Sequence, residues 1–155
     1  MKTNRKKLII CLAIPLAVGG LAALLSGGMR TYHTLNQPPL SPPGWVFPVV
    51  WSILYLLMGY ASYRILISDA DPDAIRKALT FYFIQLALNF LWPLVFFGLQ
   101  QYFAAFLLLL VLWVFIYLTM YSFGKIDDTA QNLLIPYLLW VTFAGYLNLG
   151  VALLN

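Results

Sequence analysis

The stretch LNQPPLSPPGWVFPVVWSILYLLMGY, residues 35–60, joins a proline-rich segment directly to a long apolar one. Four prolines fall within residues 38–43, and tryptophan, phenylalanine and tyrosine recur through residues 45–55. Proline lacks a backbone donor and clashes with the preceding helical turn, so the first part is not helix interior. The apolar run that follows favours a helix. The stretch therefore predicts a stiff loop at the mouth of a hydrophobic helix.

The composition places this helix in a membrane. Of the 155 residues, 63% are hydrophobic and 9% are charged, whereas soluble domains carry about 25% charged residues. Lys, Arg, Asp and Glu are absent from residues 8–29, 31–63, 78–124 and 129–155. Because a spanning helix needs roughly 20 apolar residues, these tracts hold one, one, two and one spans.

We therefore expect an all-α integral membrane protein, a five-transmembrane-helix bundle, formed by a single domain over residues 1–155. The predicted spans are residues 8–27, 44–67, 79–98, 101–123 and 131–153. The long third tract is divided at residues 98–101, where a glycine and a glutamine pair suit a turn at headgroup level. The chain shows no internal repeat and no separable soluble domain.

Charge asymmetry predicts the orientation. With five spans, eight basic residues fall on one side of the membrane: Lys2, Arg5, Lys6, Lys7, Arg64, Arg76, Lys77 and Lys125. Only Arg30 falls on the other side. The positive-inside rule then puts the N-terminus in the cytoplasm and the proline loop outside, and the short basic N-terminus suits a bacterial plasma membrane. The alternative is a cleavable signal peptide, but the first apolar run exceeds the usual 7 to 15 residues.

Conventional catalytic machinery is missing from the spans. They contain no Ser/His/Asp set, no paired carboxylates, no phosphate-binding glycine loop and no cluster of metal ligands, which excludes hydrolysis and phosphoryl transfer. Cys11 has no partner for a disulfide. His33 is either an ordinary loop histidine or, less favoured, a metal or haem ligand. The net charge of +4 comes from residues flanking the spans and indicates no nucleic-acid partner.

Amides are the informative polar groups inside the spans. Gln85, Asn89 and Trp92 are spaced i, i+4 and i+7 and so share one helical face. A buried amide requires a partner, and two interpretations remain open. Either the amides bond to neighbouring helices, or they line a cavity and meet a polar group of a ligand.

Two other predicted helices repeat this arrangement of a tryptophan with hydrogen-bonding residues. In the last span Trp140, Ala144, Leu147 and Asn148 share a face, and the small Ala144 between larger side chains favours a recess with an amide at its lip. In the second span the corresponding face carries Trp51, Tyr55, Met58 and Ser62. Flat rings in this arrangement suit stacking on a planar aromatic ligand.

The remaining tryptophans fit ordinary membrane roles. Trp45 lies at the edge of its span and suits the interfacial aromatic belt. Trp113 lies near mid-span beside apolar neighbours, so lipid contact or core packing is the better interpretation.

Three ordered motifs resemble the TspO or translocator protein family, the tryptophan-rich sensory proteins related to the mitochondrial peripheral benzodiazepine receptor. The first is the prolines of residues 38–43 followed by Trp45, Trp51, Leu54, Tyr55, Met58 and Gly59. The others are LNFLWPLVFFG, residues 88–98, and PYLLWVTFAGYLN, residues 136–148. The resemblance extends over almost the whole chain.

The resemblance implies a five-helix bundle, commonly homodimeric, with a pocket that opens toward the long first loop. Members bind porphyrins and related tetrapyrroles, and isoquinoline carboxamide or benzodiazepine drugs, and some promote light-dependent breakdown of protoporphyrin IX. Such a protein needs no cofactor, because the porphyrin is ligand or substrate. Carried over by position, the ligand-binding residues are Tyr32, Trp51, Tyr55, Asn89, Trp92, Trp140, Phe143, Ala144 and Leu147, to which the spacing adds Asn148.

The resemblance also bears on the proline loop and on cholesterol. The prolines suit a stiff lid over the pocket, although they also suit simple helix termination. The animal proteins carry a cholesterol-recognition pattern with a tyrosine and then an arginine at the end of the last helix. Here residues 147–155 read LNLGVALLN and contain neither, so we expect no cholesterol site there.

Three functions follow as hypotheses. The first is a tetrapyrrole-binding membrane sensor, in which Trp51 and Trp140 are oxidisable neighbours of a light-excited ring and support its degradation. The second is a transporter of tetrapyrroles or other amphipathic molecules, although repeats and buried ionisable residues are missing. The third is a membrane scaffold without a ligand. Light-dependent bleaching of bound porphyrin, ligand flux into vesicles, or a pocket filled by side chains would distinguish them.

Overall fold

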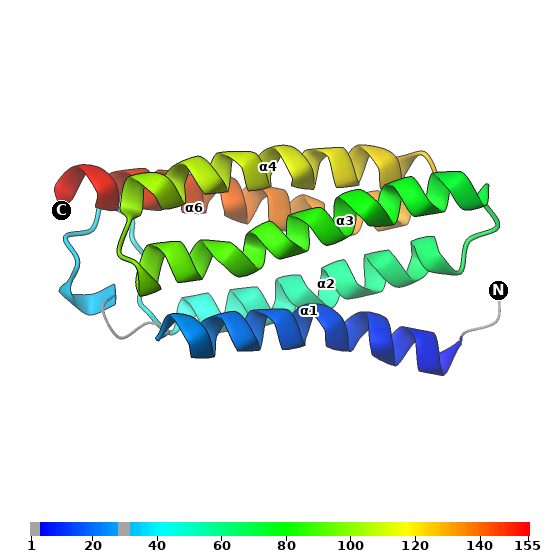
Figure 1. Cartoon of the computed structure of the whole chain (residues 1–155), viewed down its shortest axis with the longest axis horizontal. Coiled ribbons are helices and arrows are strands. Elements are labelled where there is room, and N and C mark those ends of the chain that lie inside the picture. The colour runs from blue at the N-terminus through cyan, green and yellow to red at the C-terminus, as the bar shows by residue number, and fades with distance from the viewer. Residues whose placement is uncertain (1–3, 28–31) are drawn as a thin grey trace.

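The computed structural model describes residues 4–27 and 32–155. Its helices are α1 (Arg5–Ser26), α2 (Val46–Leu66), α3 (Pro72–Pro93), α4 (Tyr102–Gly124), α5 (Asp128–Leu133) and α6 (Ile135–Leu154), with a short 3₁₀ turn η1 (Tyr32–Thr34) and a π-helical turn η2 (Leu94–Gly98). Within the described residues, five helical segments are long and apolar enough to cross a membrane. The expected all-α integral membrane bundle is confirmed (Figure 1).

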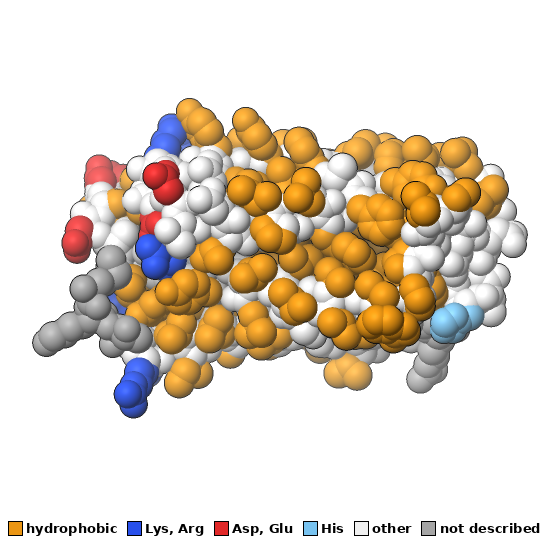
Figure 2. All heavy atoms as spheres, turned by 180° about the vertical axis from the view of Figure 1, so that it is seen from behind, with side chains coloured by type: hydrophobic (Ala, Val, Ile, Leu, Met, Phe, Trp, Pro, Cys, Tyr) orange, Lys and Arg blue, Asp and Glu red, His pale blue; other side chains and the backbone are white. Residues whose placement is uncertain are grey.

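The bundle is an elongated set of roughly parallel and antiparallel helices (Figure 1). The most extensive packing joins α1 to α2, α3 to α4, and α4 to α6. The main core lies between these helices and includes the fully buried side chains of Met58, Tyr82, Ile116 and Tyr137. Large apolar side chains also cover the outer surface (Figure 2), as a lipid-facing surface requires.

The helix boundaries differ from the predicted spans where charges or caps extend a helix beyond the apolar tract. The third span was expected from residue 79, but α3 begins at Pro72. Proline is favoured in the first helical turn, and the Asp71 side chain caps this end by accepting from the Asp73 N–H at 3.1 Å. Counting only uncharged residues therefore shortened α3 by two turns.

The last span is also longer than expected and is interrupted. It begins with α5 at Asp128, capped by Asp127, and passes into α6 at Leu134. Pro136 explains the interruption, because proline has no N–H to continue the α5 hydrogen-bond ladder. The remaining predicted ends agree with the observed spanning segments to within three residues, since η2 continues α3 to Gly98.

A glycine allows the backbones of α1 and α2 to approach closely. A Cβ atom built on Gly59 would lie 2.5 Å from the backbone oxygen of Cys11, so only glycine allows this contact. The two antiparallel helices therefore touch near the N-terminal end of α1. The helices remain in contact as far as Gly19, where a Cβ atom would lie 2.2 Å from the Tyr55 ring.

An ion pair closes the charged end of the bundle. Arg64 Nε donates to Asp127 Oδ2 at 2.8 Å, joining the end of α2 to the start of α5. Burial alone would raise the pKa of Asp127, but the hydrogen bonds from Arg64 and from the backbone of Ala130 and Thr129 outweigh it and lower the pKa. A carboxylate with a lowered pKa stabilises the fold at neutral pH, and this contribution is lost as the pH falls through that pKa.

Candidate ligand-binding site

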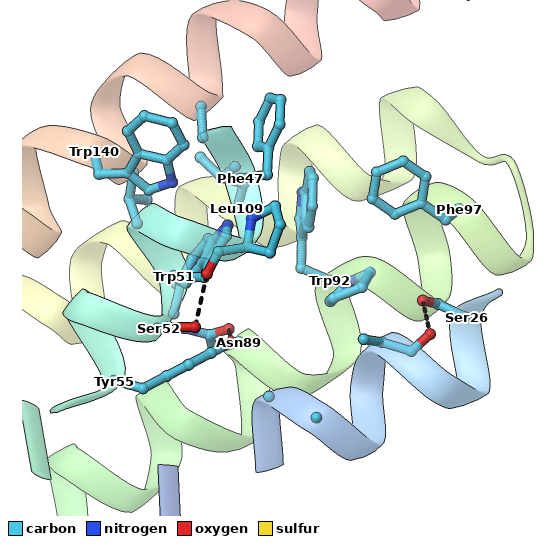
Figure 3. Close-up of a pocket in the computed structure, with 18 of the residues that line it drawn as sticks. Ser26, Phe47, Trp51, Ser52, Tyr55, Asn89, Trp92, Phe97, Leu109 and Trp140 are labelled. Atoms are coloured by element: carbon cyan, nitrogen blue, oxygen red, sulfur yellow. Dashed lines mark hydrogen bonds between the residues drawn. The ribbon is translucent and has the colours of Figure 1, made fainter. Parts of the chain in front are cut away.

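A pocket of about 340 Å³ lies inside the bundle, in the half opposite the charged end, and all five spanning segments line it (Figure 3). Its volume is within the roughly 300–1,000 Å³ of small-molecule sites. The walls are mainly apolar and aromatic, and the few polar side chains are Ser26, Ser52, Tyr55 and Asn89. Such a site suits an apolar planar body with few polar groups.

The tryptophans of three helices meet at this pocket. Trp51 of α2, Trp92 of α3 and Trp140 of α6 all line it, although they are far apart in the sequence. Trp51 lies 5.4 Å from the Tyr55 ring and 6.2 Å from the Tyr137 ring, centre to centre. The helical spacings that singled out these indoles thus bring them to one cavity.

The structure brings only part of the predicted set to the pocket wall. Trp51, Tyr55, Asn89, Trp92, Trp140 and Ala144 line the pocket, whereas Tyr32, Phe143, Leu147 and Asn148 are not among its lining residues. Tyr32 reaches the site indirectly, because its ring contacts Phe47 at 5.0 Å and Phe47 contacts Trp140 at 5.8 Å. Phe143 lies beside Trp140 at 5.7 Å.

Asn148 has a structural role in place of the expected polar lip. Its Oδ1 accepts from Trp92 Nε1 at 3.0 Å, and its Nδ2 donates to the backbone oxygen of Tyr102 at 2.9 Å. These bonds tie α6 to α3 and α4 and leave the amide buried. Asn148 therefore fixes the indole of Trp92 from behind the pocket.

A chain of buried hydrogen bonds forms the floor of the site. Tyr55 donates to Asn89 Oδ1 at 3.2 Å, and Asn89 Nδ2 donates to the Tyr137 hydroxyl at 2.6 Å. The Tyr137 hydroxyl in turn donates to Gln85 Oε1 at 2.6 Å. The helix-to-helix interpretation of both amides is thus confirmed, and Asn89 lines the pocket as well.

Two polar atoms of the site lack a hydrogen-bond partner among the described residues: Gln85 Nε2 in the floor and Trp140 Nε1 in the wall. Trp140 Nε1 is buried and makes no hydrogen bond to any described residue, and Figure 3 shows the nitrogen edge of this indole toward the pocket. A buried donor left unpaired costs about 1–3 kcal/mol. A ligand with an acceptor at this position would remove that cost.

Sequence reasoning missed the contribution of α1. Leu16, Gly19, Gly20, Ala23 and Ser26 line the pocket, yet no residue of the first span was predicted in it. The available signal was the frequency of glycine and alanine in residues 17–23, since small side chains leave room for a ligand between helices. Tyr137, which joins the two amides of the floor, was also missed.

The proline loop is held against the end of α6. Asn36 N donates to Asn155 Oδ1 at 3.1 Å, and Asn155 Nδ2 donates back to the Asn36 oxygen at 2.8 Å. Tyr146 donates to the Pro39 oxygen at 2.6 Å. A Cβ on Gly150 would lie 2.4 Å from the Pro38 ring, so glycine is needed for this close packing. The loop is thus fastened at several points to α6.

The other residues singled out from the sequence occupy ordinary positions. Trp45 is 69% exposed at the loop end of α2, and Trp113 donates to the Thr142 hydroxyl at 2.9 Å while packing on the core. His33 lies in the loop with its ring 5.7 Å from that of Tyr32. Lys2 and Arg30, which entered the charge count, lie outside the described residues.

Comparison with known proteins agrees with this architecture. A sequence model of the TspO/MBR family matches residues 11–154. A tryptophan-rich protein TspO of Chlorobaculum tepidum is 38% identical over 150 residues, covering 96% of this chain and 95% of the relative. A tryptophan-rich sensory protein of Cereibacter sphaeroides is 42% identical, covering 80% of this chain and 76% of the relative. The translocator protein of Bos taurus is 39% identical, covering 78% and 72%. The motifs, the five spanning helices and these matches agree, and the chain belongs to the TspO/MBR family.

Proposed function

We propose that this protein is a membrane sensor that binds porphyrins, such as protoporphyrin IX, in the pocket between its helices. The observation that carries the proposal is that Trp51, Trp92 and Trp140 line one apolar cavity. Aromatic rings stack favourably on one another at offset or edge-to-face geometries, so indoles suit a large planar ligand. The cavity is not filled by side chains, whereas a scaffold protein without a ligand would need no cavity.

The polar groups of the pocket complement the polar groups of such a ligand. The unpaired Trp140 Nε1 would donate to a carboxylate oxygen of a porphyrin, or to the carbonyl oxygen of an isoquinoline carboxamide or benzodiazepine-type drug. Hydrogen bonds to a charged acceptor contribute about 1.5–3 kcal/mol, more than those to a neutral one. We therefore expect porphyrins with propionate side chains to bind more tightly than their esters.

The proposal includes light-dependent degradation of the bound porphyrin. Trp51 and Trp140 would act as oxidisable neighbours of the light-excited ring, and the protein would position the ring beside them. The assay is porphyrin absorbance under fixed illumination, with a dark control and at equal occupancy. Transport is the alternative, and ligand flux into sealed vesicles containing the protein separates it from sensing.

Porphyrin titration followed by quenching of tryptophan fluorescence tests the binding site. Ala144 lines the pocket, so the larger side chain of Ala144→Phe should fill part of it. We expect Kd to rise by a factor of about ten or more, which corresponds to ~1.4 kcal/mol. The matched control is Leu139→Phe on the same helix, because Leu139 is 64% exposed on the outer surface. Equal affinities for the two variants would remove the α6 wall from the site.

We also propose that the charged end faces the cytoplasm of a bacterial cell. The described basic residues lie at the helix ends on one end of the bundle, with His33 at the other (Figure 2). The positive-inside rule then puts the proline loop and the C-terminus outside. A reporter fused to the C-terminus should be extracytoplasmic, and a cytoplasmic signal would contradict the orientation. The homodimer that the family resemblance implies can be tested by light scattering.

A further inference from the structure

The residues that line the pocket differ in their exposure, depending on the helix to which they belong. Among the residues that line it, the exposed ones are Leu16, Gly20, Ala23, Pro48 and Ser52. All of them belong to α1 or α2. The lining residues from α3, η2, α4 and α6 are buried or half-buried. The pocket therefore reaches the surface of the bundle between α1 and α2.

The packing of these two helices explains the opening. They are in contact at Gly59, which touches the backbone of Cys11, and at Gly19, where a Cβ atom would lie 2.2 Å from the Tyr55 ring. One residue further on, a Cβ on Gly20 would meet nothing within 4 Å. Ala23, one turn beyond Gly19, and Ser52, one turn before Tyr55, both line the pocket and are exposed. The two helices therefore do not close over the pocket there, in the half of the bundle near the proline loop.

The end of the pocket beneath the loop is held more firmly. The hydrogen bonds between Asn36 and Asn155, and between Tyr146 and Pro39, fasten the loop to α6. Passage from the aqueous side would require these bonds to break. Between described residues, no hydrogen bond joins α1 to α2 beside the pocket, and the gap there faces the apolar core of the bilayer, because both helices are spanning segments.

We propose that this gap is a lateral entrance, through which ligands pass from the bilayer into the pocket without opening the loop. It admits a class of ligand that dissolves in the membrane: an amphipathic molecule with an apolar ring body. The proposal rests on the proposed function, since it describes how the same pocket is filled.

A reversible cross-link across the gap tests the entrance. Ala23→Cys and Ser52→Cys, in a Cys11→Ala background, place one thiol on each side, and a bifunctional methanethiosulfonate reagent joins them through reducible disulfides. The probe is protoporphyrin IX added to protein in nanodiscs, with quenching of tryptophan fluorescence followed in time. Relative to the same double-cysteine protein before cross-linking, an obstructed entrance slows both association and release by about tenfold or more. A loss of affinity with an unchanged association rate would contradict the entrance. Reduction of the linker should restore both rates.

Two further cross-linked pairs serve as controls. Ile10→Cys with Tyr60→Cys joins the same helices beside the Gly59 contact, where both side chains are exposed and away from the pocket. Asn36→Cys with Asn155→Cys fastens the loop to α6. Neither cross-link should change the rates. If the loop cross-link slows binding and the α1–α2 cross-link does not, ligands enter from the aqueous side and the proposal is overturned.

The supply of ligand gives a second measurement that needs no cross-link. Protoporphyrin IX, with two propionates, is compared with the more water-soluble coproporphyrin, with four, at equal free aqueous concentration. Entry from the bilayer predicts association rates that rise with the lipid partition coefficient of each porphyrin. Equal association rates for the two porphyrins at equal aqueous concentration would contradict the entrance. Failure of the uncross-linked parent protein to bind porphyrin at all would instead refute the proposed function, so the two failures are distinguishable.

Discussion

The unpaired indole of Trp140 leads to a prediction with opposite signs for stability and binding. Its Nε1 is buried without a hydrogen-bond partner among the described residues. Trp140→Phe replaces the indole by a smaller aromatic ring and removes the donor, which relieves a cost of about 1–3 kcal/mol. The smaller ring loses some packing, but little, because the indole borders an open pocket. We therefore expect the free energy of unfolding without ligand to be unchanged or slightly raised.

The same substitution should weaken ligand binding. If a ligand oxygen accepts from Trp140 Nε1, its loss removes a hydrogen bond worth about 0.5–1.5 kcal/mol for a neutral acceptor, or roughly 2- to 12-fold in Kd. For a porphyrin carboxylate the loss should be larger. A variant that gains stability while it loses affinity would assign the buried N–H to the ligand.

Trp92→Phe is the matched control, because Trp92 lines the same pocket but has a partner. Its Nε1 donates to Asn148 Oδ1 at 3.0 Å. Removing this donor leaves the buried Asn148 oxygen unpaired, and hydrogen bonds between membrane helices contribute about 0.6 kcal/mol on average and at most about 1.7. Trp92→Phe should therefore lower the free energy of unfolding by an amount in that range.

Unfolding by sodium dodecyl sulfate in mixed micelles, followed by circular dichroism, gives the stabilities, and porphyrin titration gives the affinities. The reasoning is refuted if Trp140→Phe destabilises the ligand-free protein as much as Trp92→Phe does, since the N–H would then have a partner. Unchanged affinity of Trp140→Phe would show that the ligand places no acceptor there.

Three more predictions concern the bundle and its photochemistry. Gly59→Ala should destabilise the protein by about 1–3 kcal/mol, because its Cβ would clash with the α1 backbone. Gly20→Ala should be neutral or stabilising by up to about 1 kcal/mol, because its Cβ would meet nothing. Unfolding in mixed micelles gives the free energy of unfolding of both variants. Asp127→Ala should cost about 1–3 kcal/mol by removing both a helix cap and an ion pair, and Asp127→Asn should cost less because asparagine still caps. Replacing both Trp51 and Trp140 by Phe should slow light-dependent bleaching at equal porphyrin occupancy, and bleaching at the parental rate would reduce these indoles to packing surfaces.

The number and type of helices could be predicted because the bilayer constrains both. A segment that spans hydrocarbon must satisfy its backbone internally and must be apolar for about 20 residues, and both demands are visible in composition. The start of α3 could not be read in this way. Its first turns carry Asp73, Arg76 and Lys77 beyond the apolar tract, and only the Asp71–Pro72 cap marks where the helix begins.

The pocket-lining residues were predictable where they share one face of a single helix. Asn89 and Trp92 of α3, like Trp51 and Tyr55 of α2, come to the pocket because residues about one turn apart share a face. The first helix offered no such signal. Gly19 and Gly20 line the pocket through the absence of a side chain, and whether a gap beside glycine is filled depends on a neighbouring helix.

The dependence on neighbouring helices also explains why the spacing assigned too much of the α6 face to the pocket. Their spacing places four residues on one face of α6: Trp140, Ala144, Leu147 and Asn148. One face of a helix, however, meets different neighbours along its length. Near Trp140 and Ala144, α6 faces the cavity. One turn further on it meets α3 and α4, where Asn148 binds the Trp92 indole and the backbone of Tyr102. The Asn148 amide, which the spacing had assigned to the ligand, instead holds the Trp92 indole in place. Asn148→Leu should therefore affect the pocket by loosening the Trp92 indole, and not by removing a direct contact between Asn148 and a ligand.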